Sequence, residues 1–292
     1  MFLKGTFRII LNMHRLNMEG SIGNFNALTK VILVGRSESG WDLKEANGIS
    51  GNMLKHFHAK HMVELITAKG NDNLCDDCKR GVFFRTRVKV KSEKEMIENC
   101  AIDDLHGFLA TETQVRRESL SKFSFAVPVE DGLFGITTVT HNRVVMDTSG
   151  KIEAQQAMML FKSEYASGIY AFMVSMDLKY VGRPLANPSY KALNDDKILE
   201  RAKTAIEALG LLLQGDMGAK MSSSFPISKV VEGFVVTSKV PIPAPVHGYY
   251  RDYFEESLKI YKDLVNGNLI NKDDFKIHII GPVSYTHLTL PT

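Results

Sequence analysis

The alternation of apolar and polar residues predicts four β-strands. In residues 4–18, Phe7, Ile9, Leu11 and Met13 alternate with polar side chains, which is the pattern of a half-buried strand. The other strands are expected at residues 113–132, where Phe123, Phe125 and Val127 form the apolar face, at the aromatic and β-branched run 167–178, and at residues 228–243, which prolines close.

Helical spacing marks two long segments between these strands. After Ser50, a suitable N-cap, Leu54, Phe57, His61 and Leu65 follow one stripe. In the second helix the inward positions are Ile198, Ala202, Ala205, Leu209 and Leu212, with Asn194 or the aspartates after it as the cap and Gly215 at the end. The resulting order, β-α-β-β-α-β, is that of an α+β ferredoxin-like fold, the fold of RRM domains.

The chain is much longer than a minimal fold of this kind. The excess lies in three inserts, residues 19–49, 67–114 and 128–165. The first is expected to be a loop region, and the second carries short helical signals. The third resembles a long hairpin that turns near Asp147–Gly150. We expect residues 1–282 to form a single RRM-like domain with these insertions.

The last ten residues, Val283–Thr292, are set apart from this domain. The peptide VSYTHLTLPT translates back, codon by codon, into the mosaic-end adapter of transposon-based sequencing libraries. We therefore expect residues 283–292 to be a non-native tail and exclude them from fold reasoning.

Composition narrows the class of protein. With 44% hydrophobic residues and a net charge of +3, the chain can bury a large core and is neither a polybasic tail nor an acidic disordered protein. Three cysteines make no disulfide framework, and neither an N-terminal signal nor a long apolar run is present. We expect a cytoplasmic, soluble protein without a membrane partner.

Basic and hydroxyl side chains gather at the start of the segment 113–132. Arg116, Arg117, Ser119 and Lys122 have few acids nearby, and such a set suits an anionic ligand such as a phosphate backbone. The alternative is a solvated strand face, which is the usual role of such a charge run.

Further candidate contacts lie elsewhere along the chain. Ser50 and Asn52 precede or begin the first helix, where free backbone amides attract phosphates, although both can equally be plain caps. In that helix Lys55 and His56 point away from the apolar stripe, whereas we expect His61 to be a core histidine. The remaining candidates are Arg15 in the segment 4–18, His141 and Arg143 in the hairpin, and Lys220.

Three cysteines raise the question of a metal. Cys75 and Cys78 have the Cys-x-x-Cys spacing of a zinc knuckle, and Cys100 is a third thiol. The fourth ligand would be His106 or a histidine of the first helix. A single Cys-x-x-Cys pair is weak evidence, so we favour reduced, unliganded cysteines and no cofactor, with structural zinc as the alternative.

Signs of catalysis are few. Asp103 and Asp104 are adjacent, and adjacent carboxylates on a helix point about 100° apart, so we expect helix-surface acids and not an acid–base pair. The chain contains no P-loop, dinucleotide-binding turn, HExxH or nucleophile elbow. We therefore expect a protein that is not an enzyme.

Several blocks together resemble one known family. FRIILNMHRLNMEGSIGNFNALTKVILV, ISGNMLKHFHAKHM, VRRESLSKFSFAVP, KSEYASGIYAFMVSMDLKYVG and QGDMGAKMSSSFP look like the motifs of the DevR-type CRISPR backbone subunit of type I-A and I-B Cascade. The resemblance runs from the first strand to about Pro245. It implies an RRM-like palm, helical fingers at residues 67–114 and a β-hairpin thumb at 133–165.

The resemblance also implies a function in antiviral defence. Members of this family bind crRNA, the CRISPR guide, and several copies stack along it in a helical filament. The filament assembles with other Cascade subunits, and target DNA binds through pairing with the guide. Where the family's loop has further basic residues, this chain offers only Lys220. Two rivals remain open, an RNA-cleaving endoribonuclease of the same RRM-like superfamily and a ferredoxin-like enzyme for small molecules.

Overall fold

A large mixed sheet with helices packed on both of its faces forms the centre of the molecule. The computed structural model describes residues 1–38, 40–70, 73–143, 159–218 and 225–281. Strand β1 (Phe2–His14) lies between β12 (Met159–Met176) and β13 (Ile227–Ser238) and is antiparallel to both. The short strands β9 (Ser121–Phe123) and β10 (Val127–Pro128) pair with β12 on its other edge. The predicted α+β class is confirmed, and the tail 283–292 lies outside the described residues.

Strand β1 is covered on both faces, so the expectation of a half-buried strand is wrong. Phe7, Ile9 and Leu11 belong to the main hydrophobic core, as predicted. Arg8, on the opposite face, is also buried because its guanidinium donates to the carbonyl oxygens of Gly248 (2.7 Å) and Tyr250 (2.9 Å). Residues 248–250 therefore cover the face of β1 that the sequence pattern assigned to solvent.

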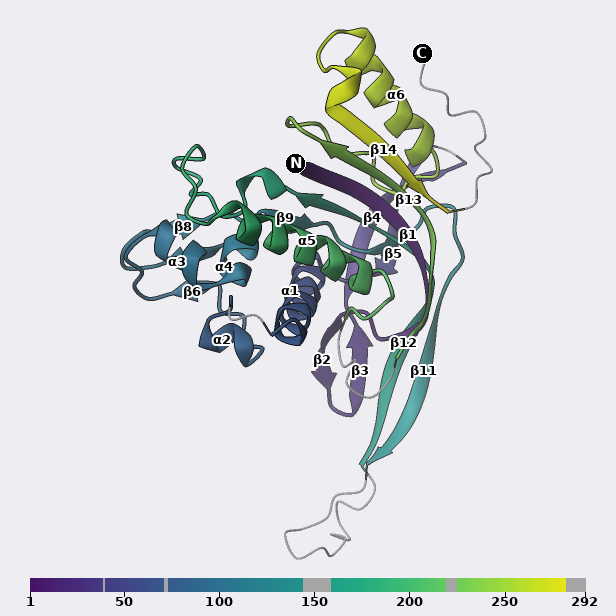
Figure 1. The fold of residues 1–292 in the computed structure, drawn as a ribbon. Coiled ribbons are helices and arrows are strands. Elements are labelled where there is room, and N and C mark those ends of the chain that lie inside the picture. The colour runs from purple at the N-terminus through teal and green to yellow at the C-terminus, as the bar shows by residue number, and fades with distance from the viewer. Residues whose placement is uncertain (39, 71–72, 144–158, 219–224, 282–292) are drawn as a thin grey trace, which may run out of the picture.

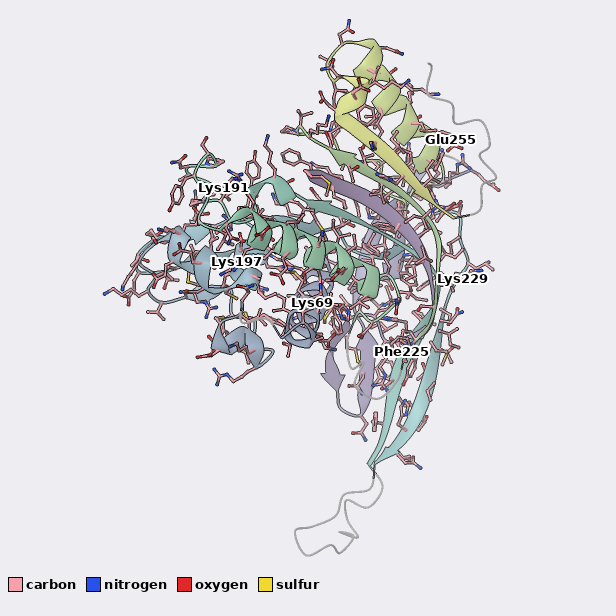
Figure 2. The ribbon with its side chains drawn as sticks, viewed as in Figure 1. Lys69, Lys191, Lys197, Phe225, Lys229 and Glu255 are labelled. Atoms are coloured by element: carbon pink, nitrogen blue, oxygen red, sulfur yellow. The ribbon has the colours of Figure 1, made fainter. Side chains whose placement is uncertain are left out.

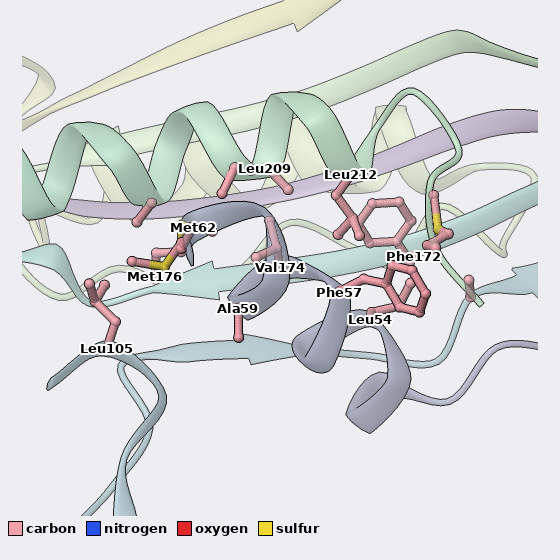
Figure 3. Packing of buried hydrophobic residues seen from close by; sticks show 14 of the residues in the cluster. Leu54, Phe57, Ala59, Met62, Leu105, Phe172, Val174, Met176, Leu209 and Leu212 are labelled. Atoms are coloured by element: carbon pink, nitrogen blue, oxygen red, sulfur yellow. The ribbon is translucent and has the colours of Figure 1, made fainter. Parts of the chain in front are cut away.

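Helices α1 (Gly51–Ala68) and α5 (Asp195–Leu212) pack on each other and on the sheet. Figure 3 shows side chains of both helices meeting Phe172, Val174 and Met176 of β12. Both predicted caps are confirmed, since Ser50 Oγ accepts from Met53 N (3.2 Å) and Asn194 Oδ1 accepts from Lys197 N (3.0 Å).

The insert at residues 67–114 contains the expected helices, all short. In chain order its elements are α2 (Asp76–Lys79), β6 (Thr86–Arg87), α3 (Glu93–Asn99), α4 (Ala101–His106) and β7 (Phe108–Ala110). Strand β8 (Arg116–Arg117) completes a small sheet with β7 and β6. This small sheet is separate from the central one.

The insert at residues 19–49 is not a loop region. It contains β2 (Met18–Ile22), β3 (Phe25–Leu28), β4 (Lys30–Ser37) and β5 (Gly40–Asn47), which form two hairpins. Strand β3 also pairs with β12 in parallel, over Lys162 and Ser163. This long-range pairing, which local sequence does not reveal, helps to order the insert.

The segment 113–132 is not one long strand, which corrects the sequence prediction. It is divided into β8, β9 and β10, with Val127 buried, Phe123 half-buried and Phe125 47% exposed. The chain departs from the strand at Ser124, whose Oγ accepts from Met173 N (2.8 Å). A side chain therefore replaces part of the backbone pairing there.

The third insert is an antiparallel ribbon, as predicted. Strand β11 (Phe134–Arg143) pairs with the first half of β12, from Phe134 opposite Gly168 to Arg143 opposite Met159. The ribbon extends beyond the rest of the sheet (Figure 1). The predicted turn near Asp147–Gly150 lies outside the described residues.

Elements after β13 had no sequence prediction. Helix α6 (Tyr253–Asn266) and strand β14 (Phe275–Ile280) form a second core with β13, built around Phe234, Tyr261 and Phe275. Two short 3₁₀ helices, η1 (Leu178–Tyr180) and η2 (Lys272–Asp274), complete the list. Among the described residues, no helix combines the length and apolar character needed to span a membrane.

Candidate nucleic-acid interface

Five of the predicted binding residues meet at one hollow. The N-terminus of α1 and strand β9 with its flanking residues enclose about 320 Å³. The predicted residues at this hollow are Ser50, Asn52, Lys55, Ser119 and Lys122, and the other lining residues are Gly51, Ser121, Phe123, Ser124 and Phe125. Two sequence segments that we considered separately thus form one surface.

Close contact between α1 and β9 gives the hollow its shape. A Cβ on Gly51 would lie 2.2 Å from Phe123 O, so only glycine lets the helix begin this close to the strand. Ser50 Oγ caps the helix and also accepts from Asn17 Nδ2 (3.3 Å), which assigns Ser50 a structural role. The first backbone amides of α1 have no carbonyl one turn earlier in the helix, and α1 has no acid in its first turn.

Positive charge is concentrated on one side of the hollow. Burial, and after it the nearby charges of Arg85 and Lys122, together lower the pKa of Lys55 to about 8. Lys122 forms an ion pair with Glu118 at the surface. An anion bound here would relieve the repulsion between these cations, which is the electrostatic condition for a phosphate site.

Hydroxyl groups and one aromatic ring complete the lining. Ser119 Oγ donates to Ser121 O (2.7 Å), and Ser124 Oγ bonds His247 Nε2 (2.9 Å). Ser121 Oγ is buried without a hydrogen-bond partner among the described residues. Phe125 exposes nearly half of its surface at the rim, where a ring can stack on a base.

Arg117 must be removed from the predicted set. Its side chain is fully buried, where Nη2 donates to Asp104 Oδ1 (2.7 Å) and Nη1 to Glu93 Oε1 (2.6 Å). Three backbone carbonyls, of Asp104, Tyr180 and Arg183, accept further hydrogen bonds from it. All its donors are used inside the protein, so it has none to offer a phosphate. Arg116, the neighbouring candidate, is exposed in β8 but does not line the hollow.

Asp103 and Asp104 are also placed differently from the prediction. They are buried, not at a helix surface. Asp104 accepts from Arg117, from Arg201 Nη1 (2.9 Å) and from Gly182 N (3.0 Å), while Asp103 accepts from Arg87 Nη2 (3.2 Å). These carboxylates hold α4 against its neighbours, and the expectation of surface acids is wrong.

The remaining basic and histidine candidates lie apart from the hollow. Arg15 and His141 share Tyr165, whose hydroxyl accepts from Arg15 Nε (2.9 Å) and bonds His141 Nε2 (3.1 Å). His56 is exposed on α1 and packs edge-on to Phe83, with its pKa lowered by partial burial and then by nearby cations. His61 is buried, as expected. The side chain of Arg143 and all of Lys220 lie outside the described residues.

The three cysteines come together, but the expected histidine does not join them. The Sγ atoms of Cys75, Cys78 and Cys100 lie within 4.8 Å of one another. His106 Nε2 bonds His58 Nδ1 (2.9 Å) instead, and burial lowers the pKa of both rings. His58, a histidine of the first helix and so a candidate for the fourth ligand, therefore bonds His106.

Sequence reasoning missed two contributors to this surface. Phe125 was assigned to a buried face because it keeps the alternation of Phe123 and Val127. Arg85 was not singled out because a lone arginine in an insert gives no local signal, yet its charge acts on Lys55. Only the fold brings Phe125 to the hollow and the charge of Arg85 close to Lys55.

Comparison with known proteins adds independent evidence. A family model described as "CRISPR-associated negative auto-regulator DevR/Csa2" matches residues 5–258. A protein of Methanocaldococcus jannaschii named "CRISPR-associated protein Cas7/Cst2/DevR" is 39% identical over 285 residues, covering 90% of this chain and 89% of the relative. A protein of Thermoproteus tenax with the same name is 34% identical over 275 residues, covering 89% of this chain and 81% of the relative.

A solved structure shares the fold. A chain of "CRISPR RNA-guided surveillance complex, pre-nicking" superposes with a TM-score of 0.53 at 12% sequence identity. The match covers 99% of this chain and 94% of that chain. At this identity the likeness shows the fold alone.

Proposed function

Because this chain belongs to the DevR/Csa2 family of CRISPR-associated proteins, we propose that it is a crRNA-binding backbone subunit of a Cascade-type complex. It binds the sugar-phosphate backbone of the guide without reading its bases. A subunit that coats a variable guide has to bind in this way, since the base edges must stay free to pair with target DNA.

The hollow between α1 and β9 is the observation that carries the proposal. It combines two lysines and the amides at a helix N-terminus, which are donors to phosphate oxygens, with several serine side chains in its lining. None of these groups distinguishes one type of base from another. Phe125 at the rim adds a stacking surface, which tolerates any base.

The wider architecture extends this proposal. The sheet with α1 and α5 would be a ferredoxin-like palm, residues 67–114 the fingers, and the β11–β12 ribbon the thumb. Copies would stack head to tail, with the thumb of one subunit reaching the next, since repeated heterologous contacts build open helical assemblies. Other Cascade subunits would cap the filament, and target DNA would be met through the guide.

The proposed role is non-catalytic. None of the described residues that line the hollow is a histidine, aspartate or glutamate, the side chains that usually supply acid–base groups or metal ligands for RNA cleavage. Labelled RNA should therefore stay intact during prolonged incubation with the protein. Cleavage that disappears in His56→Ala or His141→Ala would favour the endoribonuclease instead.

The direct test measures RNA affinity against salt concentration. Two unrelated single-stranded RNAs of equal length should bind with similar Kd, and Lys55→Ala/Lys122→Ala should weaken both equally. Because each phosphate contact on a single strand contributes about 0.7 to the slope of log K against log salt, the double variant should flatten that slope by roughly 1.4.

A matched control removes a lysine away from the hollow. Lys197 is exposed at the start of α5 (Figure 2), so Lys197→Ala changes net charge without touching the lining. It should leave the slope nearly unchanged. Equal losses in the control and in each lysine of the hollow would show that binding is diffuse and would remove the hollow from the proposal.

A further inference from the structure

Three thiols from two separate parts of the insert at residues 67–114 converge on one point. Cys75 is the N-cap of α2, Cys78 lies within α2, and Cys100 joins α3 to α4. Their Sγ atoms all lie within 4.8 Å of one another, and no disulfide links them. These are the only three cysteines in the sequence, so the chain brings its whole complement of thiols together.

The spacing of the three sulfur atoms is that of a metal site. A tetrahedral zinc ion with Zn–S bonds of about 2.3 Å holds its sulfur ligands about 3.8 Å apart, which requires only a small contraction of this cluster. Cys78 and Cys100 are buried and Cys75 is half-buried. We propose that Cys75, Cys78 and Cys100 bind one Zn²⁺ ion, with water at the fourth position on the side of Cys75.

The charges around the thiols favour a zinc–thiolate site. Arg87 Nη2 lies 3.6 Å from Cys75 Sγ and also donates to Asp103, while Arg85 Nη1 lies 4.0 Å from Asp103 Oδ1. Arg85 Nη1 and Arg87 Nε are buried without a hydrogen-bond partner among the described residues. Zinc with three thiolates carries one net negative charge, and guanidinium groups are suited to balance it.

The site has a structural role to fill. Among the described residues, the small sheet of this insert has its own core of three buried residues, Val90, Phe108 and Ala110, with Met96 and Val115 packed against them, while Cys78 and Cys100 belong to the main core. Small units of this kind commonly need a metal or a disulfide in addition to their core. The ion would fasten α2 to the junction of α3 and α4, some twenty residues further along the chain.

The binding step is an exchange of protons for metal. Each thiol loses its proton to solvent as its sulfur binds Zn²⁺, and no electron is transferred. The competing chemistry is oxidation of two of the thiols to a disulfide, which would remove two of the ligands. Metal binding and disulfide formation therefore exclude each other and can be told apart.

Titration of the reduced, metal-free full chain with Co²⁺ tests the proposal, because Co²⁺ occupies zinc sites and reports its ligands in its absorption spectrum. We expect about one Co²⁺ per chain, thiolate-to-cobalt charge-transfer bands, the intense visible bands of a tetrahedral ion, and displacement by Zn²⁺. Reduced protein that gives no thiolate-to-cobalt bands would overturn the proposal. So would a purified chain that is lighter by two hydrogens and regains no Co²⁺ binding after reduction.

Variants identify the ligands. Cys75→Ser, Cys78→Ser and Cys100→Ser should each lose most of the charge-transfer intensity and weaken Co²⁺ binding more than tenfold, since even outer partners of a metal site cost about tenfold or more. Asp76→Asn is the matched control, because Asp76 is an exposed acid in the same short helix and lies outside the thiol cluster. If Asp76→Asn loses as much affinity as the cysteine variants, the metal binds to surface carboxylates and the assignment is wrong. The spectrum of the unaltered chain decides the matter if a variant fails to fold.

Discussion

Lys55 is the residue whose environment most affects the proposed interface. Burial, Arg85 and Lys122 together lower the pKa of Lys55 to about 8. In the free protein this lysine therefore loses its charge at mildly alkaline pH. A bound phosphate favours the charged form and would raise the pKa again. RNA binding should therefore take up a proton at Lys55 when the pH is above about 8.

This linkage predicts a pH-dependent affinity for RNA. The charge is present below pH 8 and lost above it, so affinity should fall as the pH rises, by up to about tenfold between pH 7 and pH 9 for one proton taken up. Fluorescence anisotropy at constant ionic strength measures it. Lys55→Arg keeps its charge throughout and should bind almost independently of pH. The same decline in Lys55→Arg would place the titrating group elsewhere.

Asp104 anchors the insert at residues 67–114 through buried ion pairs. It is fully buried and accepts from Arg117 and Arg201, both also buried. Asp104→Asn leaves two buried guanidinium groups without their shared countercharge, which should lower the free energy of unfolding by about 3–5 kcal/mol. Urea unfolding followed by circular dichroism measures the loss.

The control for this prediction is an exposed carboxylate in an ion pair. Asp195 pairs with Lys191 at the surface, and Asp195→Asn should leave the urea midpoint almost unchanged because solvent screens that pair. A loss in Asp104→Asn no larger than in Asp195→Asn would mean that the buried network adds little stability.

Single residues also show how far sequence can assign roles. Lys122 and Arg117 stand five positions apart in one basic run, and sequence gave both the same role. Arg117 is buried because Asp104 and Glu93 face it from another part of the chain, whereas Lys122 is exposed and pairs with Glu118 at the surface. The residue types predicted an anion-binding surface. Only tertiary contacts show whether a given basic residue can bind a phosphate or is used in an internal ion pair.

At the level of elements, the join between α1 and β9 forms the hollow. Gly51 allows the helix to start against the backbone of Phe123, and a Cβ there would meet Phe123 O at 2.2 Å. The helix and the strand must therefore separate if residue 51 carries a side chain.

We predict that Gly51→Ala lowers both stability and RNA affinity. Overpacking should cost about 1–3 kcal/mol of unfolding free energy, and displacement of α1 should weaken RNA binding several-fold. Gly210→Ala is the control, because Gly210 lies within α5 with open space around its missing Cβ and should gain up to about 1 kcal/mol in helix propensity. Thermal unfolding and anisotropy measure the two effects. Unchanged RNA binding by a folded Gly51→Ala would show that the hollow need not be this narrow.

Elements with local signals were predictable, and those held by distant contacts were not. Helices α1 and α5 and the caps Ser50 and Asn194 follow from spacing and residue type. The division of residues 113–132 into three short strands was missed, since it depends on Ser124 bonding Met173 and on Arg117 turning inward. Helix α6 had a usable signal in Phe254, Ser257 and Tyr261, which lie on one face and are buried.

At the level of the whole molecule, the β11–β12 ribbon is the feature that most suggests contact with another copy. It extends beyond the sheet (Figure 1), and the side chains of Ile136 and Leu160 are 44% and 49% exposed on it. Exposed apolar side chains on an extended element favour a protein partner. In the proposed filament that partner is the neighbouring subunit.

We therefore predict that RNA length sets the size of the assembly. Light scattering after size-exclusion chromatography should show a mass that increases in equal steps with the length of a single-stranded RNA, because each subunit covers a fixed stretch of backbone. Ile136→Glu/Leu160→Glu should keep the affinity for an RNA that holds one subunit but should reduce the mass on longer RNAs. Thr138→Glu/Thr140→Glu, on the same strand, adds the same charge at polar positions and should disturb assembly less. One subunit bound per RNA at every length would contradict the filament while leaving the phosphate site intact, because that site depends on α1 and β9 alone.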